Sequence, residues 1–311
     1  MSADTVRGPR AWLGYALVTV VLWGVWGAFS GLSPQYGFPE TLVYCVWALT
    51  MVPPALIVLS MARWRLDRSV RAIGYGLAVG LLGAAGQLIL FYAVARGPAY
   101  LIFPVISLSP VVTIAMSFAL LGERTGRLGA IGIMLALLAL PTFDFSPGGA
   151  GGAAAGWLLP AILVMLCWGV QAYFMKAANH VMSAASIFVY MTLSGLLVIP
   201  IAWAMTDWTR PINWGLDGPG LAALIQVLNA IGALTLVFAF RYGKAIIVAP
   251  LANAGAPLAT ALLSLVVLGV VPGALKIVGI VLALAASLLL AIEPDATDTN
   301  AETGLPNSAG T

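Results

Sequence analysis

Neutral polar and tryptophan side chains recur inside long apolar stretches of this sequence. Amide, hydroxyl and indole groups hydrogen-bond small solutes, and apolar residues form most of the wall of such sites. The candidates for binding a solute are Trp23, Trp26, Gln87, Tyr92, Ser107, Trp168, Gln171, Asn229 and Asn253. The same stretches hold no deep carboxylate or clear cation. The pattern predicts a largely apolar cavity for a small neutral or zwitterionic solute, whereas a polyphosphate would require a basic cluster.

Two proline-bearing apolar stretches, residues 97–113 and 243–257, match each other at a nearly constant offset. Proline removes a helix donor, and paired interrupted segments in two halves of a chain indicate the binding site of a transporter. The candidate helix breaks are Pro104, Pro110, Pro250 and Pro257. Ordinary kinked packing helices are the alternative interpretation.

Glu123 is a candidate gating residue, and it follows the apolar span that contains Pro104 and Pro110. It follows Leu121 and Gly122 and precedes Arg124. We predict that this carboxylate contributes to an inner gate. The alternative is a helix cap or a surface ion pair with Arg127.

The elements that position these residues are membrane spans. Hydrophobic residues make up 61% of the chain and charged residues 8%, against about 25% charged residues in soluble proteins. Each apolar run approaches the roughly 20 residues that cross a bilayer. The ten predicted spans are 11–31, 39–61, 73–95, 99–121, 127–143, 156–177, 183–205, 219–240, 245–268 and 272–292. Pro53 and Pro54 are expected to bend the second span.

The spans form two copies of five. The sequence Trp-Gly-Val occurs at 23–25 and again at 168–170, in the opening span of each copy, and Tyr44 corresponds to Tyr190. Because five is odd, the second copy is inverted across the membrane. The predicted fold is an all-α polytopic membrane protein with ten transmembrane helices as two inverted five-helix repeats.

The domain organisation follows from these spans. We predict a cytoplasmic N-terminus (1–10), a first five-helix repeat (11–143), a glycine- and alanine-rich periplasmic linker (144–155), a second five-helix repeat (156–292) and a disordered cytoplasmic tail (293–311).

Cation placement predicts the orientation. With the N-terminus in the cytoplasm, all cations except Arg96, Arg210 and Lys276 lie at inner boundaries, as the positive-inside rule requires. Both termini are then cytoplasmic, in a multi-pass protein of the cell (inner) membrane. The loop 63–71 is the main positive anchor and attracts anionic lipid. The net charge of +3 follows from such loops and requires no nucleic acid.

Few residues of this sequence could catalyse a reaction or bind a metal ion. The chain has one histidine, His180, and two cysteines, Cys45 and Cys167, which we interpret as small core residues within spans. No H-E-x-x-H motif is present. We therefore expect no enzyme activity, no cofactor and no metal site.

The whole pattern resembles the drug/metabolite transporter superfamily, in its ten-span EamA-type branch. The resemblance covers nearly all of residues 10–292 and includes both Trp-Gly pairs and the Leu-Gly-Glu-Arg sequence at 121–124. The family often repeats Leu-Gly-Glu in the second copy, but here Leu268 and Gly269 are followed by Val270. The resemblance implies a cavity lined mainly by spans 1, 3, 4, 6, 8 and 9, and movement of small metabolites, commonly amino acids, often outward.

These observations predict export of a small neutral or zwitterionic metabolite, such as an amino acid, by alternating access. A multidrug or organic-cation exporter and a metabolite uptake permease are the alternatives, and a channel or membrane scaffold is a more remote one. The expected partners are the small-molecule substrate and the lipid bilayer, with the protein monomeric or weakly dimeric.

Overall fold

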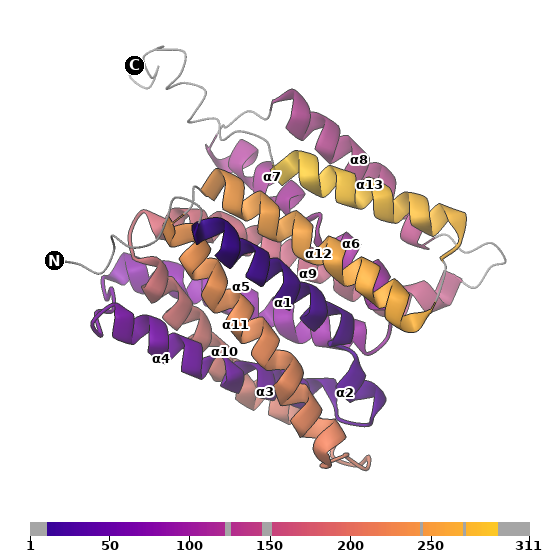
Figure 1. Cartoon of the computed structure of the whole chain (residues 1–311), viewed down its shortest axis with the longest axis horizontal. Helices are drawn as coiled ribbons and strands as arrows, with labels where there is room; N and C mark the ends of the chain where they lie inside the picture. Colours follow the sequence, from indigo (N-terminus) through magenta and orange to yellow (C-terminus); the bar gives the residue numbers. More distant parts are fainter. Residues whose placement is uncertain (1–10, 122–125, 145–150, 243–244, 270–271, 292–311) are drawn as a thin grey trace.

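The computed structural model describes residues 11–121, 126–144, 151–242, 245–269 and 272–291, and every regular element within them is helical (Figure 1). The first half contains α1 (Ala11–Phe29), α2 (Leu32–Gln35), α3 (Glu40–Thr50), α4 (Val52–Met61), α5 (Val70–Val94), α6 (Ala99–Ile106), α7 (Ser109–Leu121) and α8 (Arg127–Asp144). The second half contains α9 (Gly151–Asn179), α10 (Ala184–Ala204), the π-helix η2 (Leu216–Gly220), α11 (Leu221–Tyr242), α12 (Ala245–Leu268) and α13 (Ala274–Ala291). Helix α9 begins at Gly151, so it includes residues that the sequence assigns to the linker.

The helices match the expected membrane spans. Six helices in the described ranges are long and apolar enough to cross a bilayer. Four shorter apolar helices occupy the places of the remaining predicted spans, at Ala99–Thr113, Arg127–Ala139, Gly255–Val267 and Ala274–Ala286. The all-α polytopic fold predicted from hydropathy is confirmed.

Two of the spans are interrupted, and both interruptions lie beside prolines. The second span divides into α3 and α4 at Met51, just before Pro53 and Pro54. The fourth divides into α6 and α7, and at the end of α6 the hydroxyl of Ser107 donates to the carbonyl of Pro104 at 2.7 Å. That bond occupies a carbonyl next to a break in the backbone ladder.

The ninth span differs from the fourth. Helix α12 runs without interruption from Ala245 to Leu268, across both Pro250 and Pro257. The sequence match predicts breaks in both spans, but only the fourth has one. A proline removes a single donor, and a long helix packed along α1 retains the rest of its ladder.

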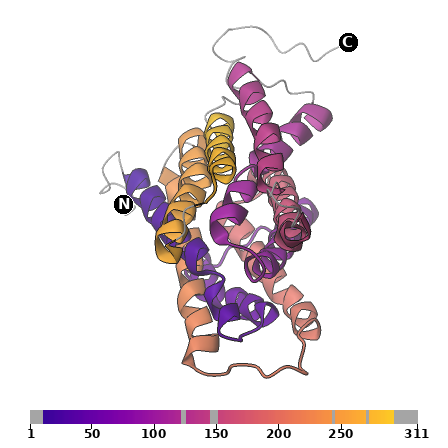
Figure 2. The ribbon, with the colours of Figure 1, turned by 90° about the vertical axis from the view of Figure 1, so that its right-hand side faces the viewer.

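The two halves pack on each other in a reciprocal manner. Helix α1 lies against α11 and α12 of the second half, and α9 lies against α5, α6 and α7 of the first. Helices α8 and α13, the last of each half, pair along one side of the bundle (Figures 1 and 2). Corresponding helices therefore have corresponding partners in the other half, as expected for two inverted repeats.

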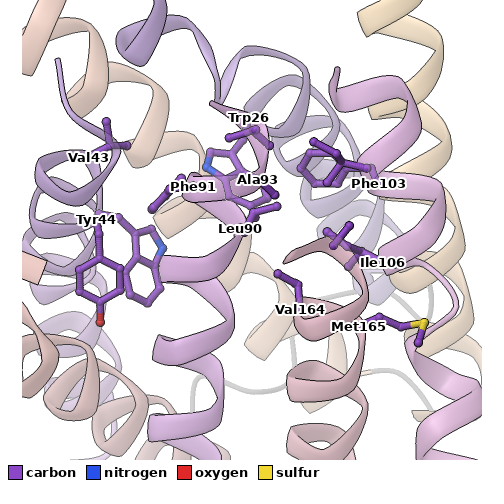
Figure 3. Packing of buried hydrophobic residues seen from close by; sticks show 14 of the residues in the cluster. Trp26, Val43, Tyr44, Leu90, Phe91, Ala93, Phe103, Ile106, Val164 and Met165 are labelled. Atoms are coloured by element: carbon purple, nitrogen blue, oxygen red, sulfur yellow. The ribbon is translucent and has the colours of Figure 1, made fainter. Parts of the chain in front are cut away.

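The main apolar core lies where these helices meet. Figure 3 shows Leu90 and Phe91 of α5 beside Trp26 of α1, and Phe103 of α6 on the other side of that indole. The rings of Trp26 and Phe103 meet edge to face, with centroids 5.8 Å apart. Helix α1 contributes to this core and also packs on α11. The core therefore adjoins the α1–α11 interface, whose polar contacts are described below.

Candidate functional site

Each Trp-Gly pair sits against a glycine of the opposite half. The indole of Trp23 lies on Gly232 of α11, and the indole of Trp168 lies on Gly86 of α5. A Cβ at Gly86 would meet Trp168 Nε1 at 2.5 Å, so only glycine leaves room for the ring. Small residues let helices approach closely in a membrane. The repeated Trp-Gly sequence therefore makes the same contact twice, once in each half.

A second pair of contacts reinforces this symmetry. Thr260 Oγ1 of α12 donates to the carbonyl of Gly24 at 3.1 Å, and Thr113 Oγ1 of α7 donates to the carbonyl of Gly169 at 2.8 Å. In both cases the donor belongs to the fourth span of one half and the acceptor to the first span of the other. These hydroxyls connect the proline-bearing helices to α1 and α9.

A group of tryptophan–amide contacts lies between α1, α3 and α11. Trp26 Nε1 donates to Gln226 Oε1 at 2.8 Å, and Trp47 Nε1 donates to Asn229 Oδ1 at 2.9 Å. Trp23 Nε1 donates to the backbone oxygen of Asn229 at 3.1 Å. Gln226 is only 1% exposed and Asn229 8%. We call these five residues the indole–amide group.

Gln87 of α5 is a buried amide with an unused donor. Its side chain is 4% exposed, and its Nε2 has no hydrogen-bond partner. Gln87 precedes Leu90 and Phe91 by about one helical turn, so it shares their face of α5, and both of those residues lie beside Trp26 (Figure 3). A buried amide N–H without a partner costs free energy. A solute that accepts a hydrogen bond at this position would remove that cost.

The corresponding region of the second half is bonded differently. Gln171 occupies the position that matches Trp26, and its Nε2 donates to the backbone oxygen of Val79 at 2.9 Å. It packs on Gly83, one turn from the contact of Trp168 with Gly86. The amide of Gln171 is thereby joined to the frame of α5 and not to another side chain.

Comparison with protein families accounts for this duplicated arrangement. A model of the EamA-like transporter family matches residues 10–141 and again residues 155–292. The chain belongs to the EamA-like transporter family. Among solved structures, one crystal structure of a protein resembles this chain with a TM-score of 0.59 and 17% sequence identity. The match covers 91% of this chain and 98% of that chain. No curated protein matches.

The other predicted site residues of this EamA-like transporter lie apart from the indole–amide group. Ser107 is buried at the α6–α7 interruption, where it bonds Pro104. Tyr92 is 42% exposed, and the guanidinium carbon of Arg96 lies 3.3 Å from the centre of its ring. Arg96 also forms an ion pair with Glu40 at 2.8 Å. Tyr92 thus lies at the end of α5, in a contact with charged groups.

Some predicted residues of the transporter fall where the structure describes less. Glu123 lies outside the described residues. Asn253, Pro110 and Pro250 lie within described helices, but their side chains are outside the described part. Pro257 is half-buried in the continuous α12. The binding and gating roles of these five residues stay predictions.

Sequence reasoning did not single out Trp47. Its indole is buried beside Tyr44, with ring centroids 5.3 Å apart, and it supplies the donor that Asn229 accepts. A signal was available, because a tryptophan in the interior of an apolar span needs a partner for its N–H. The pairing of Gln226 with Trp26 depends on how the two halves pack.

The buried polar groups of the transporter are electrically neutral. In the described ranges, every buried polar side chain is a serine, threonine, asparagine or glutamine. The ion pair of Glu40 and Arg96 lies at the helix ends, and both side chains are partly exposed. The buried interior thus contains hydrogen-bonding and aromatic groups, without a fixed charge among the described residues.

The halves are also connected at both ends of the bundle. At the end that carries the loop 63–71, which we call the arginine end, Asp67 Oδ2 accepts from the backbone N of Ser183 at 2.8 Å and from Ser186 Oγ at 2.9 Å. These donors hold the pKa of Asp67 below its usual value. At the opposite end Thr41 and Thr206 share a hydroxyl–hydroxyl bond of 2.7 Å, and Asn213 Nδ2 donates to the carbonyl of Tyr36.

Proposed function

We propose that this transporter moves a small neutral or zwitterionic metabolite with an apolar part, such as an amino acid, by alternating access and in the outward direction. The observation that carries the proposal is the unpaired Nε2 of Gln87, which is buried one residue after Gly86, on which the indole of Trp168 packs. An acceptor on the solute, such as a carboxylate or carbonyl oxygen, would take this N–H. Indole faces nearby suit the apolar part of the solute.

The neutral interior supports this class of solute over strongly charged ones. A zwitterion carries no net charge, so it enters an apolar site at less cost than an ion does. Polar contacts across a membrane bundle are retained mainly where they serve a pathway. Two bonds of the indole–amide group join helices of the two halves. They are Trp26–Gln226 and Trp47–Asn229, and they can exchange partners when those halves move.

We propose further that rocking of one half against the other provides access. The interrupted α6–α7 segment and the proline-bearing α12 would move, since each is connected by a threonine to the first span of the other half. We propose a monomer as the transporting unit. The cation distribution supports cytoplasmic termini in the cell (inner) membrane.

The test is counterflow in proteoliposomes, with labelled neutral amino acids against panels of amino acids, nucleobases, sugars and organic cations on the other side. Counterflow requires no ion gradient, so it works whatever the coupling. A selective signal for a neutral or zwitterionic solute supports the proposal. A response confined to organic cations, which indole faces also bind, would replace it with the drug-exporter alternative.

Gln87→Met makes the test specific. Methionine has nearly the same shape but no donor, so it removes the unpaired N–H and should leave stability unchanged or slightly higher. Transport should fall at least tenfold if that N–H binds the solute, as expected for a lost hydrogen bond of about 1.5 kcal/mol.

Ser194→Ala is the matched control for Gln87→Met. Ser194 Oγ is the other buried side-chain atom without a partner among the described residues, but it packs against Gly80 between α5 and α10. The alanine variant should transport normally. Equal transport by the wild type and both variants would show that Gln87 does not bind the solute.

We propose that transport is facilitated or of the exchange type and does not depend on protons. The interior has no titratable carboxylate among its buried described residues. Uptake and efflux rates should therefore be insensitive to an imposed pH gradient. A rate that follows the gradient, and that is lost when Glu40 or Glu123 is neutralised, would contradict uncoupled transport.

A further inference from the structure

The link between α4 and α5 concentrates positive charge on the surface. Arg63, Arg65, Arg68 and Arg71 are all exposed, and none has an ion pair in the described part of the chain. Four unpaired guanidinium groups so close in sequence create a strongly positive potential at the arginine end of the bundle. In Figure 1 this link follows the C-terminal end of α4.

The single carboxylate of the link does not neutralise these arginines. Asp67 directs Oδ2 to Ser183 and Ser186 at the start of α10, where it accepts three hydrogen bonds of 2.8 to 3.0 Å. The carbonyl of Asp67 also accepts from the hydroxyl of Tyr190 at 2.8 Å. Asp67 therefore fixes the link to the second half of the transporter and leaves the arginines available to an outside anion.

The backbone at the end of α4 is unusual for its residues. Arg63 and Trp64 have φ angles of 54° and 59°, in the left-handed region. The N–H groups of Arg63 and Trp64 bond the carbonyls of Ser60 and Leu59 at 2.9 and 2.8 Å, which is the Schellman ending of a helix. Glycine normally takes the first of these positions, and a non-glycine residue is strained there. Both side chains are exposed at this helix ending, Trp64 to 63%.

We propose that residues 63–71 form a binding site for the phosphate head group of an anionic phospholipid. Arginine binds phosphate through two parallel N–H donors, and an exposed tryptophan settles at the level of lipid head groups. The exposed Met61 precedes the arginines and the exposed Val70 lies between Arg68 and Arg71, and both provide contact for the upper acyl chains. A lipid meets both requirements at once, because it carries phosphate and an apolar body, whereas a free phosphate offers only the charge.

The test uses the full chain in detergent micelles, where membrane orientation has no influence. The midpoint of thermal unfolding is measured while phosphatidylglycerol, phosphatidylcholine or inorganic phosphate is added. A ligand of the native state raises the midpoint, and the rise grows with the logarithm of its concentration above the Kd. We expect phosphatidylglycerol to raise it with dose and the other two to have little effect.

The variants Arg63→Gln/Arg65→Gln and Arg68→Gln/Arg71→Gln should each weaken this dependence. About fivefold in apparent affinity per arginine is expected from the attraction of one cation to an anionic surface. Arg210→Gln is the matched control, because Arg210 is an exposed arginine at the opposite end, paired with Asp207. Replacement of the arginines by lysine keeps the charge and the fold but loses the paired donors, so it should give an intermediate response.

Three outcomes would overturn the proposal. An unchanged response of the glutamine variants to phosphatidylglycerol would place the lipid elsewhere. An equal response to inorganic phosphate would indicate a simple anion effect, and no response of the wild type to any addition would leave the arginines as a signal for membrane orientation only. Transport activity enters none of these measurements, so the result is independent of the proposed substrate.

Discussion

The α1–α11 contact and the α5–α9 contact occupy equivalent places in the two halves, yet they use their polar groups differently. At α1–α11, Trp26 bonds the side chain of Gln226. At α5–α9, Gln171 bonds the backbone oxygen of Val79. Tryptophan packing on glycine is the same in both. The shared part of the contact maintains the fold, while the polar part has diverged.

The difference indicates a division of roles. A bond between two side chains can change partner when a solute arrives, because both groups rotate. A bond to a helix carbonyl is fixed by the backbone, and that carbonyl already has a partner in its own helix. We infer that the α1–α3–α11 region adapts to the solute and that the α5–α9 contact serves as the frame. The predictions below test this comparison, beginning with the largest expected effect.

Gly169→Ala should destabilise the transporter more than Gly24→Ala. A Cβ at Gly169 would lie 2.6 Å from the backbone oxygen of Ser109, which cannot move aside, and 2.5 Å from Val112 Cβ. At Gly24 the close neighbour is the Cβ of Ala259 at 2.6 Å, with the next atom at 3.5 Å. Overpacking costs about 1–3 kcal/mol, so we expect the upper end for Gly169. Unfolding midpoints in micelles give the order, and the reverse order would show that the α7–α9 contact of Gly169 is no tighter than the α1–α12 contact of Gly24.

Trp26→Phe should lower the free energy of unfolding by about 2 kcal/mol and should also impair transport. Phenylalanine leaves Gln226 Oε1 buried without its donor. The double variant Trp26→Phe/Gln226→Met removes both partners and should recover part of the stability but not the transport. Unfolding and counterflow are measured on the same preparations. Recovery of transport in the double variant would mean that the pair is structural only.

Gln171→Leu is the partner experiment in the second half. Val79 O keeps its helix bond when the amide is removed, so the loss should be about 1 kcal/mol or less. Counterflow corrected for folded protein should stay near the wild-type value. A transport defect as large as that of Trp26→Phe would abolish the proposed division between an adaptable region and a frame.

Thr113→Val and Thr260→Val should have equal and small effects. Each removes one hydroxyl donor to a glycine carbonyl that retains its position in a helix, at about 1 kcal/mol. Thermal unfolding of the two single variants and of the pair measures this. Strongly unequal losses would show that the symmetry of the contacts does not extend to their energies.

We expect a small effect of pH on stability at the arginine end of the bundle and none at the opposite end. The donors from Ser183 and Ser186 lower the pKa of Asp67, so its contribution to stability is complete above the usual aspartate pKa of about 3.9. It disappears as the pH falls through the lowered value. Asp67→Asn should flatten this acid limb of the stability profile. Thr41→Val, at the neutral connection of the opposite end, should shift the profile without changing its shape.

Several features of the molecule could be predicted because they are local or periodic. Hydropathy indicated the membrane spans, since a helix in lipid must satisfy its own backbone. Pro53 and Pro54 indicated a bend in the second span, which the structure divides into α3 and α4 just before them. The repeated Trp-Gly sequence indicated duplication, and the reciprocal packing of α1 and α9 agrees with it. These inferences required no knowledge of which helix meets which.

The amino-acid sequence by itself determined the helices, the duplication and the neutral chemistry of the interior. Only the tertiary structure decided which polar groups have partners. Trp47 and Asn229 are far apart in the chain, and Gln87 has the same residue type as Gln171, yet one amide is bonded and the other is not. Hydrogen bonds act over about 3 Å, so their pairing depends on helix packing that no local pattern encodes.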